Sequence, residues 1–165
     1  RSVTHYKRFA DTGEELNTFY KNAAQCLKEK LGCILFQLPP SLHYTPEHLQ
    51  SIINAMDTSF KNVVEFRHKS WWRQDVFDAL AEKQIIFCGI DYPGTLPKTV
   101  INNAGTVYYR FYGDPVLYKS LYAKEILEAV ASTIQQTKNN AFIFFNNTWG
   151  NAALQNAEEM QQLMQ

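Results

Sequence analysis

The sequence predicts an α/β protein whose parallel strands alternate with helices. Short apolar runs alternate along the chain with longer segments in which apolar residues recur at helical spacing. The short runs are apolar for most of their length, which is typical of parallel strands that helices cover on both faces. Their polar residues stand near the C-terminal ends, where α/β enzymes assemble their sites.

The first expected elements are a helix and a buried strand. A capping box, Thr12-x-x-Glu15, opens the helix, because its hydroxyl and carboxylate would bind amides that the first turn leaves free. The apolar stripe of this helix is Leu16–Leu27, and Gly32 ends the element. Cys33–Leu38 is a short apolar run closed by two prolines, which indicates a buried strand followed by a loop.

The remaining elements repeat this alternation. In chain order they are a helix after Thr45 with its stripe at Leu49–Met56, the strand Val63–Arg67, a helix after Ser70 with its stripe at Val76–Leu80, the strand Ile85–Asp91, the strand Thr106–Tyr112, a helix with its stripe at Tyr122–Ile134, the strand Ala141–Phe145, and a helix with its stripe at Ala153–Met164. Thr45 and Ser70 are expected to cap their helices, since hydroxyl side chains accept hydrogen bonds from first-turn amides. Five parallel strands in sequence order are therefore expected.

Two layouts fit this order: an open doubly wound sheet, or part of a (β/α) barrel. Side chains alternate across a strand, so Glu65 and Arg67 share one face of theirs, and Tyr108, Arg110 and Tyr112 share one face of another. An open sheet would cover both faces with apolar helices and leave these charges badly placed. A barrel interior holds paired polar groups near its mouth. We therefore expect a TIM-type (β/α) barrel with its helices outside.

The composition excludes several classes of protein. The chain has 165 residues, of which 45% are hydrophobic and 19% charged, which suits one folded domain over residues 1–165 and excludes a disordered chain. Its 16 Lys and Arg balance 16 Asp and Glu, which argues against a generally basic nucleic-acid binder but leaves a local basic groove open. No apolar run is long enough to span a membrane. Cys26, Cys33 and Cys88 have no metal spacing and indicate a reducing, cytoplasmic location.

Polar side chains near the C-terminal ends of the expected strands form the candidate site. We assign proton transfer to Glu65, His68 and Asp91, and ligand binding to Gln37, Arg67, Trp71, Arg110, Tyr112, Asn146 and Asn147. The arginines would hold an anion bidentately, a carboxylate would move a proton, and the asparagines would orient hydroxyls. The alternative is that the carboxylates and arginines only neutralise each other, because an unpaired interior charge is strongly destabilising.

Two of these residues have structural alternatives of their own. His68 is a candidate general base or metal ligand, but a loop histidine is commonly just exposed. Trp71 and Trp72 would stack on a sugar or a base, or else pack a loop onto the barrel rim. No cofactor motif is present and no spacing demands a metal, so no metal ligands are assigned and a divalent ion is left open.

Five ordered motifs resemble the YecE-like family, also known as domain of unknown function 72. In chain order they are Phe36-Gln37-Leu38-Pro39-Pro40 with Tyr44-Thr45-Pro46-Glu47; Glu65-Phe66-Arg67-His68-x-Ser70-Trp71; Asp91-Tyr92-Pro93; Tyr109-Arg110-Phe111-Tyr112-Gly113; and Phe145-Asn146-Asn147 with Gly150-Asn151-Ala152 and Asn156-Ala157. The resemblance implies a TIM-type barrel whose biochemical activity is not established. Tyr112 stands where that family usually has a histidine. The family's N-terminal strands have no counterpart, so the resemblance implies the C-terminal part of a barrel.

The sequence is compatible with three functions. The first is an enzyme that acts on a small anionic substrate, phosphorylated or sugar-like; a hydrolase or an isomerase would fit, and the sequence does not identify the reaction. The second is a nucleic-acid-binding or phosphodiester-processing barrel whose arginines contact phosphates. The third is a non-catalytic scaffold or sensor. Because five strands cannot close the usual eight-stranded barrel, we also expect self-association through unpaired sheet edges.

Overall fold

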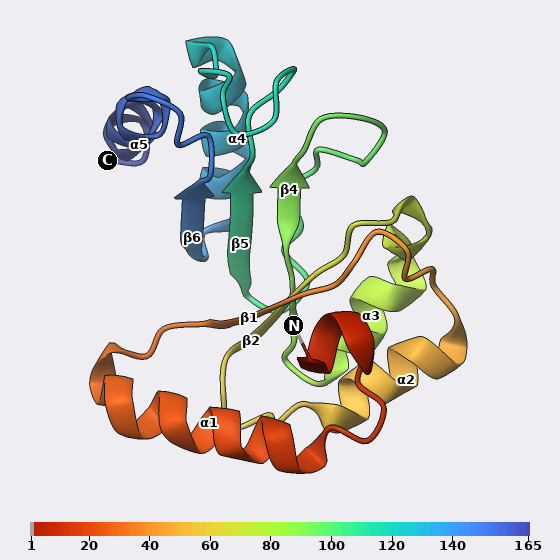
Figure 1. Cartoon of the computed structure of the whole chain (residues 1–165). Helices are drawn as coiled ribbons and strands as arrows, with labels where there is room; N and C mark the ends of the chain where they lie inside the picture. Colours follow the sequence, from red (N-terminus) through yellow and green to blue (C-terminus); the bar gives the residue numbers. More distant parts are fainter. Residues whose placement is uncertain (1) are drawn as a thin grey trace. The chain divides into compact units, whose positions relative to one another are not determined.

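The computed structural model describes residues 2–165 and divides into two compact units (Figure 1). The first unit ends at Phe87, and the second covers Cys88–Gln165. Each has its own three-stranded parallel sheet, and each is described by itself. Within residues 2–165, no helix is both long enough and apolar enough to cross a lipid bilayer.

The first unit orders its strands as β1-β2-β3, which is their order in the chain. Its elements are the π-helix η1 (Ser2–Tyr6), α1 (Gly13–Leu27), the 3₁₀ helix η2 (Lys28–Lys30), β1 (Ile34–Gln37), α2 (Pro46–Ala55), β2 (Asn62–Glu65), the 3₁₀ helix η3 (Lys69–Trp71), α3 (Gln74–Glu82) and β3 (Ile86–Phe87). The register places Gln37 beside Glu65. The last residues of β1 and β2 are therefore neighbours at one end of the sheet.

The core of the first unit forms around β2. Val64 is fully buried within the strand, and Phe66, just beyond it, stacks on Trp71 with 4.1 Å between the ring centroids. Helix α2 adds Ile52 and Ile53, which belong to the apolar stripe expected from the sequence. Burial of these large side chains gives β2 the fixed position from which the polar residues at its end project.

The second unit also orders its strands as they occur in the chain, β4-β5-β6. Its elements are β4 (Gly89–Asp91), β5 (Thr106–Phe111), α4 (Lys124–Thr137), β6 (Asn140–Phe145) and α5 (Ala152–Leu163). The three arrows point the same way in Figure 1, and the register aligns Asp91, Phe111 and Phe145 in one row. Residues that follow this row therefore meet at the C-terminal end of the sheet.

One face of β5 packs against helix α4. Tyr109 and Phe111 alternate with residues of the opposite face and are buried in the same cluster as Ile134 of α4. Gly89 of β4 permits the close approach of this layer, because a Cβ there would lie 2.6 Å from Tyr109 Cδ2 and 2.9 Å from the Thr99 carbonyl oxygen. A larger residue at position 89 would push Tyr109 out of the core.

The predicted α/β class, with parallel strands in chain order, is confirmed. The prediction of five strands is wrong, because the expected strand Ile85–Asp91 divides at Cys88 into β3 and β4, which belong to different sheets. Six strands form two open sheets, and neither closes into a barrel within residues 2–165. The apolar pattern did not reveal this break because the residues on both sides of it are equally buried.

The three predicted helix caps have different outcomes. Thr45 accepts a hydrogen bond from a first-turn amide of α2 at 3.1 Å, which confirms its cap. The capping box is wrong, because Thr12 makes no cap hydrogen bond and Glu15 pairs with Lys7 at 2.8 Å instead. The cap at Ser70 is also wrong, because η3 lies between this residue and α3.

Candidate functional site

A glutamine, a glutamate and an arginine meet at the C-terminal ends of β1 and β2. Gln37 ends β1, Glu65 ends β2, and Arg67 follows two residues later. Arg67 Nε donates to Glu65 Oε1 at 2.7 Å, and Arg67 Nη2 donates to Gln37 Oε1 at 3.3 Å. The Glu65 side chain is fully buried, whereas that of Arg67 is 11% exposed. We call these three residues the strand-end triad.

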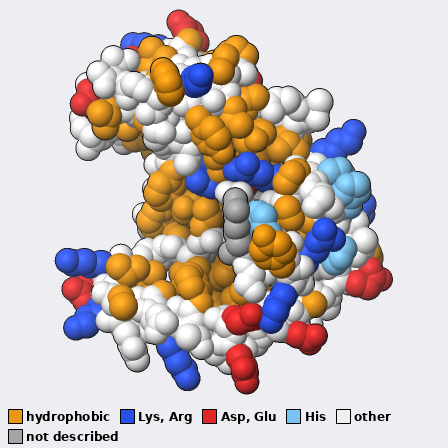
Figure 2. All heavy atoms as spheres, viewed as in Figure 1, with side chains coloured by type: hydrophobic (Ala, Val, Ile, Leu, Met, Phe, Trp, Pro, Cys, Tyr) orange, Lys and Arg blue, Asp and Glu red, His pale blue; other side chains and the backbone are white. Residues whose placement is uncertain are grey.

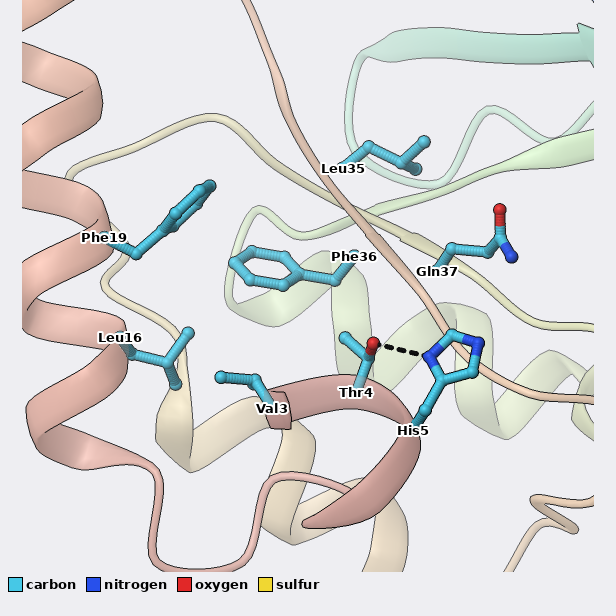
Figure 3. A pocket seen from close by; sticks show the side chains of 8 residues that line it. All are labelled: Val3, Thr4, His5, Leu16, Phe19, Leu35, Phe36 and Gln37. Atoms are coloured by element: carbon cyan, nitrogen blue, oxygen red, sulfur yellow. Dashed lines mark hydrogen bonds between the residues drawn. The ribbon is translucent and has the colours of Figure 1, made fainter. Parts of the chain in front are cut away.

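The triad borders a cavity of about 410 Å³ through Gln37 (Figure 3). Side chains of η1, α1 and β1 line this cavity: Val3, Thr4, His5, Leu16, Phe19, Leu35, Phe36 and Gln37. Most of them are apolar, and the polar groups come from Gln37 and from Thr4 and His5, whose Oγ1 and Nδ1 atoms lie 2.8 Å apart. This size, with a mainly apolar wall and a few polar groups, is typical of a small-molecule site.

His68 belongs to a group of histidines on the surface of the first unit. Its ring stacks on that of His43 with 3.8 Å between centroids, and His48 Nδ1 lies 3.1 Å from the His43 carbonyl oxygen. Figure 2 shows pale-blue histidine side chains gathered on the right of the visible face. In the described part of the chain, no group of three His, Cys, Asp or Glu residues is placed to hold a metal ion.

The neutral form of His68 is favoured. Burial, the nearby His43 and Lys69 each lower the pKa of its imidazole. His68 Nδ1 accepts the amide of Ser70 at 3.3 Å and lies 2.8 Å from Ser70 Oγ. The imidazole therefore caps η3, and it has the protonation state that a general base needs.

Trp71 is a core residue in this structure. It is fully buried, its ring stacks on Phe66, and its Nε1 donates to the Leu42 carbonyl oxygen at 2.8 Å. No face of the indole is left for a sugar or a base. Of the two roles expected for this residue, packing is therefore the one that fits.

Asp91, in the second unit, is paired with a lysine from the loop after β4. Lys98 Nζ lies 3.1 Å from Asp91 Oδ1 and 2.6 Å from Asp114 Oδ2. The Asp91 side chain is only 5% exposed, so this ammonium group neutralises a buried carboxylate. Burial by itself lowers the pKa of Lys98, but the hydrogen bonds with Asp114 and Asp91 outweigh it and the pKa is raised.

Arg110 and Tyr112 share one face at the end of β5, as the alternation predicted. Arg110 Cζ lies 4.8 Å from the centroid of the Tyr112 ring, a cation–π contact. Tyr112 is buried, and its amide donates to the Asp91 carbonyl oxygen at 2.9 Å. The amide of Asn146 donates in turn to the Phe111 carbonyl oxygen at 2.7 Å. These backbone bonds tie the C-terminal ends of β4, β5 and β6 together.

Asn147 belongs to a buried network of amide groups. It is fully buried, and its Nδ2 donates to the Ser120 carbonyl oxygen at 2.9 Å and to Asn156 Oδ1 at 3.0 Å. The Oδ1 atoms of Asn146 and Asn147 are buried without a hydrogen-bond partner among the described residues. Asn147 therefore holds two loops together, and this structure does not expose it to a ligand.

The family comparison shows which proteins this chain is related to. The sequence model of the family described as "Protein of unknown function DUF72" matches residues 1–165. This chain belongs to the DUF72 family. The resemblance expected from the five motifs is thereby confirmed.

Solved DUF72 structures share this fold. A DUF72 family protein of Thermotoga maritima MSB8 is 23% identical with a TM-score of 0.87, over 99% of this chain and 70% of its own. A DUF72 family protein of Enterococcus faecalis V583 matches in two crystal structures, at 19% and 21% identity and TM-scores of 0.81 and 0.80. These matches cover 94% and 96% of this chain, and 66% and 72% of the other. At such identities the likeness establishes the fold alone. A search among curated proteins found no match.

Three features of this DUF72 chain lay outside the sequence interpretation. They are the pairing of Lys98 with Asp91, the cavity beside Gln37, and the exposed Trp149, whose ring centroid lies 4.6 Å from Lys119 Nζ. Trp149 did have a signal, because it stands between a threonine and a glycine in a loop just after a strand. The other two join residues from separate segments and have no signal in a single sequence.

Proposed function

We propose that this DUF72 protein binds a small anionic molecule, phosphorylated or sugar-like, at the C-terminal ends of its strands and acts on it as an enzyme. The observation that carries the proposal is the fixed Arg67 guanidinium group at the end of β2. Glu65 and Gln37 orient this group in advance, so it loses little conformational entropy when an anion binds. Its partial exposure gives an anion access to it.

Gln37 connects the guanidinium group to the cavity. Because Gln37 Oε1 accepts from Arg67, its amide N–H₂ group is left to donate elsewhere, and it has no acceptor among residues 2–165. A phosphate, carboxylate or hydroxyl oxygen in the cavity would satisfy this donor. The apolar wall would then hold the carbon skeleton of the ligand.

The proposed roles of the ionisable residues follow from their burial. Glu65 is fully buried and bonded to Arg67, so we assign it to positioning the guanidinium group. His68 and Asp91 stay proposed proton-transfer groups, and His5 joins them because it lines the cavity. Arg110, Tyr112 and Asn146 stay proposed ligand-binding residues of the second unit, whereas the fully buried Asn147 is assigned to holding its two loops together.

Isothermal titration calorimetry of the full chain with inorganic phosphate and glucose 6-phosphate tests this proposal. Arg67→Gln should weaken binding at least tenfold, because the oriented cation is lost. Arg73→Gln is the matched control and should bind as the wild type does, since Arg73 also pairs with a carboxylate two residues away, Asp75, but on the surface. Equal binding by both variants, or no binding by the wild type, would refute the proposal.

A screen for phosphatase, phosphodiesterase and isomerase activity, with and without divalent metal ions, tests the enzymatic part. Turnover that Arg67→Gln loses and Arg73→Gln keeps would support an enzyme. Binding without turnover would favour a non-catalytic sensor instead. A nucleic-acid-binding function has less support here, because Trp71, one of its expected stacking residues, is buried. A steep fall of binding with salt would nevertheless favour it.

We also propose that the strands belong to a TIM-type (β/α) barrel in which residues 1–165 act as one domain. The strand order within each sheet supports this, because barrel strands follow the order of the chain whereas doubly wound sheets reverse it. A site at the strand ends of each unit, with Glu65 and Arg67 in the first and Asp91, Arg110 and Asn146 in the second, is part of this proposal. So are a cytoplasmic location, which the three free cysteines support, and self-association through sheet edges.

A further inference from the structure

Two loops of the second unit expose aromatic rings. The loop 112–123, after β5, exposes Tyr118, and the loop 146–151, after β6, exposes Trp149, which is 69% accessible. The Trp149 amide donates to the Tyr118 carbonyl oxygen at 3.1 Å, so the two loops are in direct contact. Lys119 Nζ stands 4.6 Å from the centroid of the indole. We call Tyr118, Lys119 and Trp149 the ring patch.

Buried amide groups hold both loops of the ring patch in place. Asn147, in the second loop, donates to the carbonyl oxygen of Ser120 in the first. Asn156 accepts from Asn147 and binds both backbone groups of Tyr122. Tyr118 has a φ of 63°, a left-handed conformation that a bulky residue seldom adopts without support from its surroundings. The exposed rings are thus presented from a fixed frame, as a binding site requires.

The charge of Lys119 is not neutralised within the described part of the chain. No carboxylate there forms an ion pair with its ammonium group, whereas Lys98 and Lys124 of the same unit each have a carboxylate partner. The exposed residues Thr148 and Asn151 stand on either side of Trp149 in the sequence. The ring patch therefore combines an indole that has one face under the Lys119 ammonium group, a cation that has no carboxylate partner among the described residues, and neutral hydrogen-bonding groups.

We propose that Trp149 and Lys119 form a subsite for a phosphorylated sugar. The indole stacks on the apolar face of the sugar ring, the ammonium group binds the phosphate, and Thr148 and Asn151 contact hydroxyls. An apolar partner would gain nothing from an unpaired ammonium group, and the chain has no net positive charge to attract a nucleic acid. The class of ligand is taken from the proposed function. The residues of this subsite lie in the second unit, whereas Arg67 lies in the first.

Tryptophan fluorescence tests this subsite. Trp71 is fully buried and Trp72 partly buried, so a ligand that stacks at the surface changes mainly the emission of Trp149. Glucose 6-phosphate and ribose 5-phosphate should quench it at concentrations at least tenfold lower than glucose. By calorimetry, Trp149→Ala should lose the sugar phosphate binding that Arg67→Gln retains, and Lys119→Gln should remove the preference for phosphorylated sugars. Leu154→Ala, 67% exposed on α5, is the matched control and should behave as the wild type.

The outcomes separate this inference from the proposed function. Normal binding of both sugar phosphates by Trp149→Ala and Lys119→Gln would overturn the subsite and leave the proposed function intact. If the wild type bound neither sugar phosphate, the subsite would be overturned. The role proposed for Arg67 would then still be tested by calorimetry with inorganic phosphate. Tighter quenching by a thymidine oligonucleotide, lost steeply with salt, would overturn the sugar assignment in favour of a nucleic acid. A Trp149 quench that survives in Arg67→Gln would support a separate subsite.

Discussion

Asn156 pairs with the backbone of Tyr122 much as a neighbouring strand would. Its Oδ1 accepts the Tyr122 amide and its Nδ2 donates to the Tyr122 carbonyl oxygen, both at 3.0 Å. One buried side chain thereby satisfies both backbone groups of a residue that lies in a loop, where strand pairing is not available. The same Oδ1 accepts from Asn147, so the helix α5 controls the loops that follow β5 and β6.

Replacing Asn156 by alanine should lower the free energy of unfolding by roughly 3 kcal/mol, because buried backbone and amide groups would lose their partners at about 1–3 kcal/mol each. Urea unfolding followed by circular dichroism measures this. Gln155→Ala, an exposed neighbour on the same helix, should stay within about 0.5 kcal/mol of the wild type. If the two variants were equally stable, the network would have no structural importance.

The buried pair Glu65–Arg67 should be coupled more strongly than the exposed pair Arg73–Asp75. Both join an arginine to a carboxylate two residues away, but the first pair is buried, with Arg67 Nε 2.7 Å from Glu65 Oε1, whereas the second is exposed and bidentate, at 2.8 and 2.9 Å. We expect burial to outweigh the bidentate geometry, because water screens exposed ion pairs. A double-mutant cycle with glutamine at both charged positions of the first pair should give roughly 1.5–3 kcal/mol. The same cycle with Arg73→Gln and Asp75→Asn should give about 0.2–1 kcal/mol. Equal coupling energies in the two pairs would contradict the expectation that burial strengthens the Glu65–Arg67 interaction.

Lys98→Met should destabilise the second unit because it leaves the Asp91 carboxylate buried without its counter-ion. We expect a loss of roughly 2 kcal/mol, below the usual range for buried pairs because Lys98 is itself partly exposed. Combining Asp91→Asn with Lys98→Met should recover most of the lost stability. Lys119→Met, which removes a lysine without a carboxylate partner among the described residues, serves as the control. Chemical denaturation at pH 7 compares these three variants with the wild type, and no rescue in the double variant would show that Asp91 is not the stranded group.

His68 should make the protein less stable in mild acid. Its pKa is lowered in the folded state, so the unfolded chain, with an imidazole pKa near 6.5, binds the proton more readily. Its contribution to stability is therefore complete above about pH 6.5 and is lost as the pH falls through the folded pKa. His68→Asn, which keeps an acceptor for the Ser70 amide, should flatten the melting temperature between pH 7 and 5. His48→Asn is the control and should keep the wild-type dependence of melting temperature on pH. If His68→Asn kept that dependence too, His68 would not be the cause of the loss of stability in acid.

The sequence alone determined the class of the fold and most of its elements. The expected strands Cys33–Leu38 and Thr106–Tyr112 contain β1 and β5, because an apolar run between breakers is a local signal. Thr45 was recognised as a cap for the same reason, since its partner is a nearby amide. Side-chain alternation correctly placed Glu65 and Arg67 on one face, because the period of an extended chain needs no knowledge of the rest of the fold.

Only the tertiary structure decided where the polar groups find their partners. The division of one expected strand at Cys88, the burial of Trp71 and the pairing of Asp91 with Lys98 all depend on segments that are separated along the chain. Glu15 had a suitable position for a capping box, yet an ion pair with Lys7 took its place. Ion pairs, hydrogen bonds and ring stacking act over a few ångströms of space, and distance along the sequence does not predict distance in space. The sequence therefore named the candidate residues, and the tertiary structure decided which partners their side chains have.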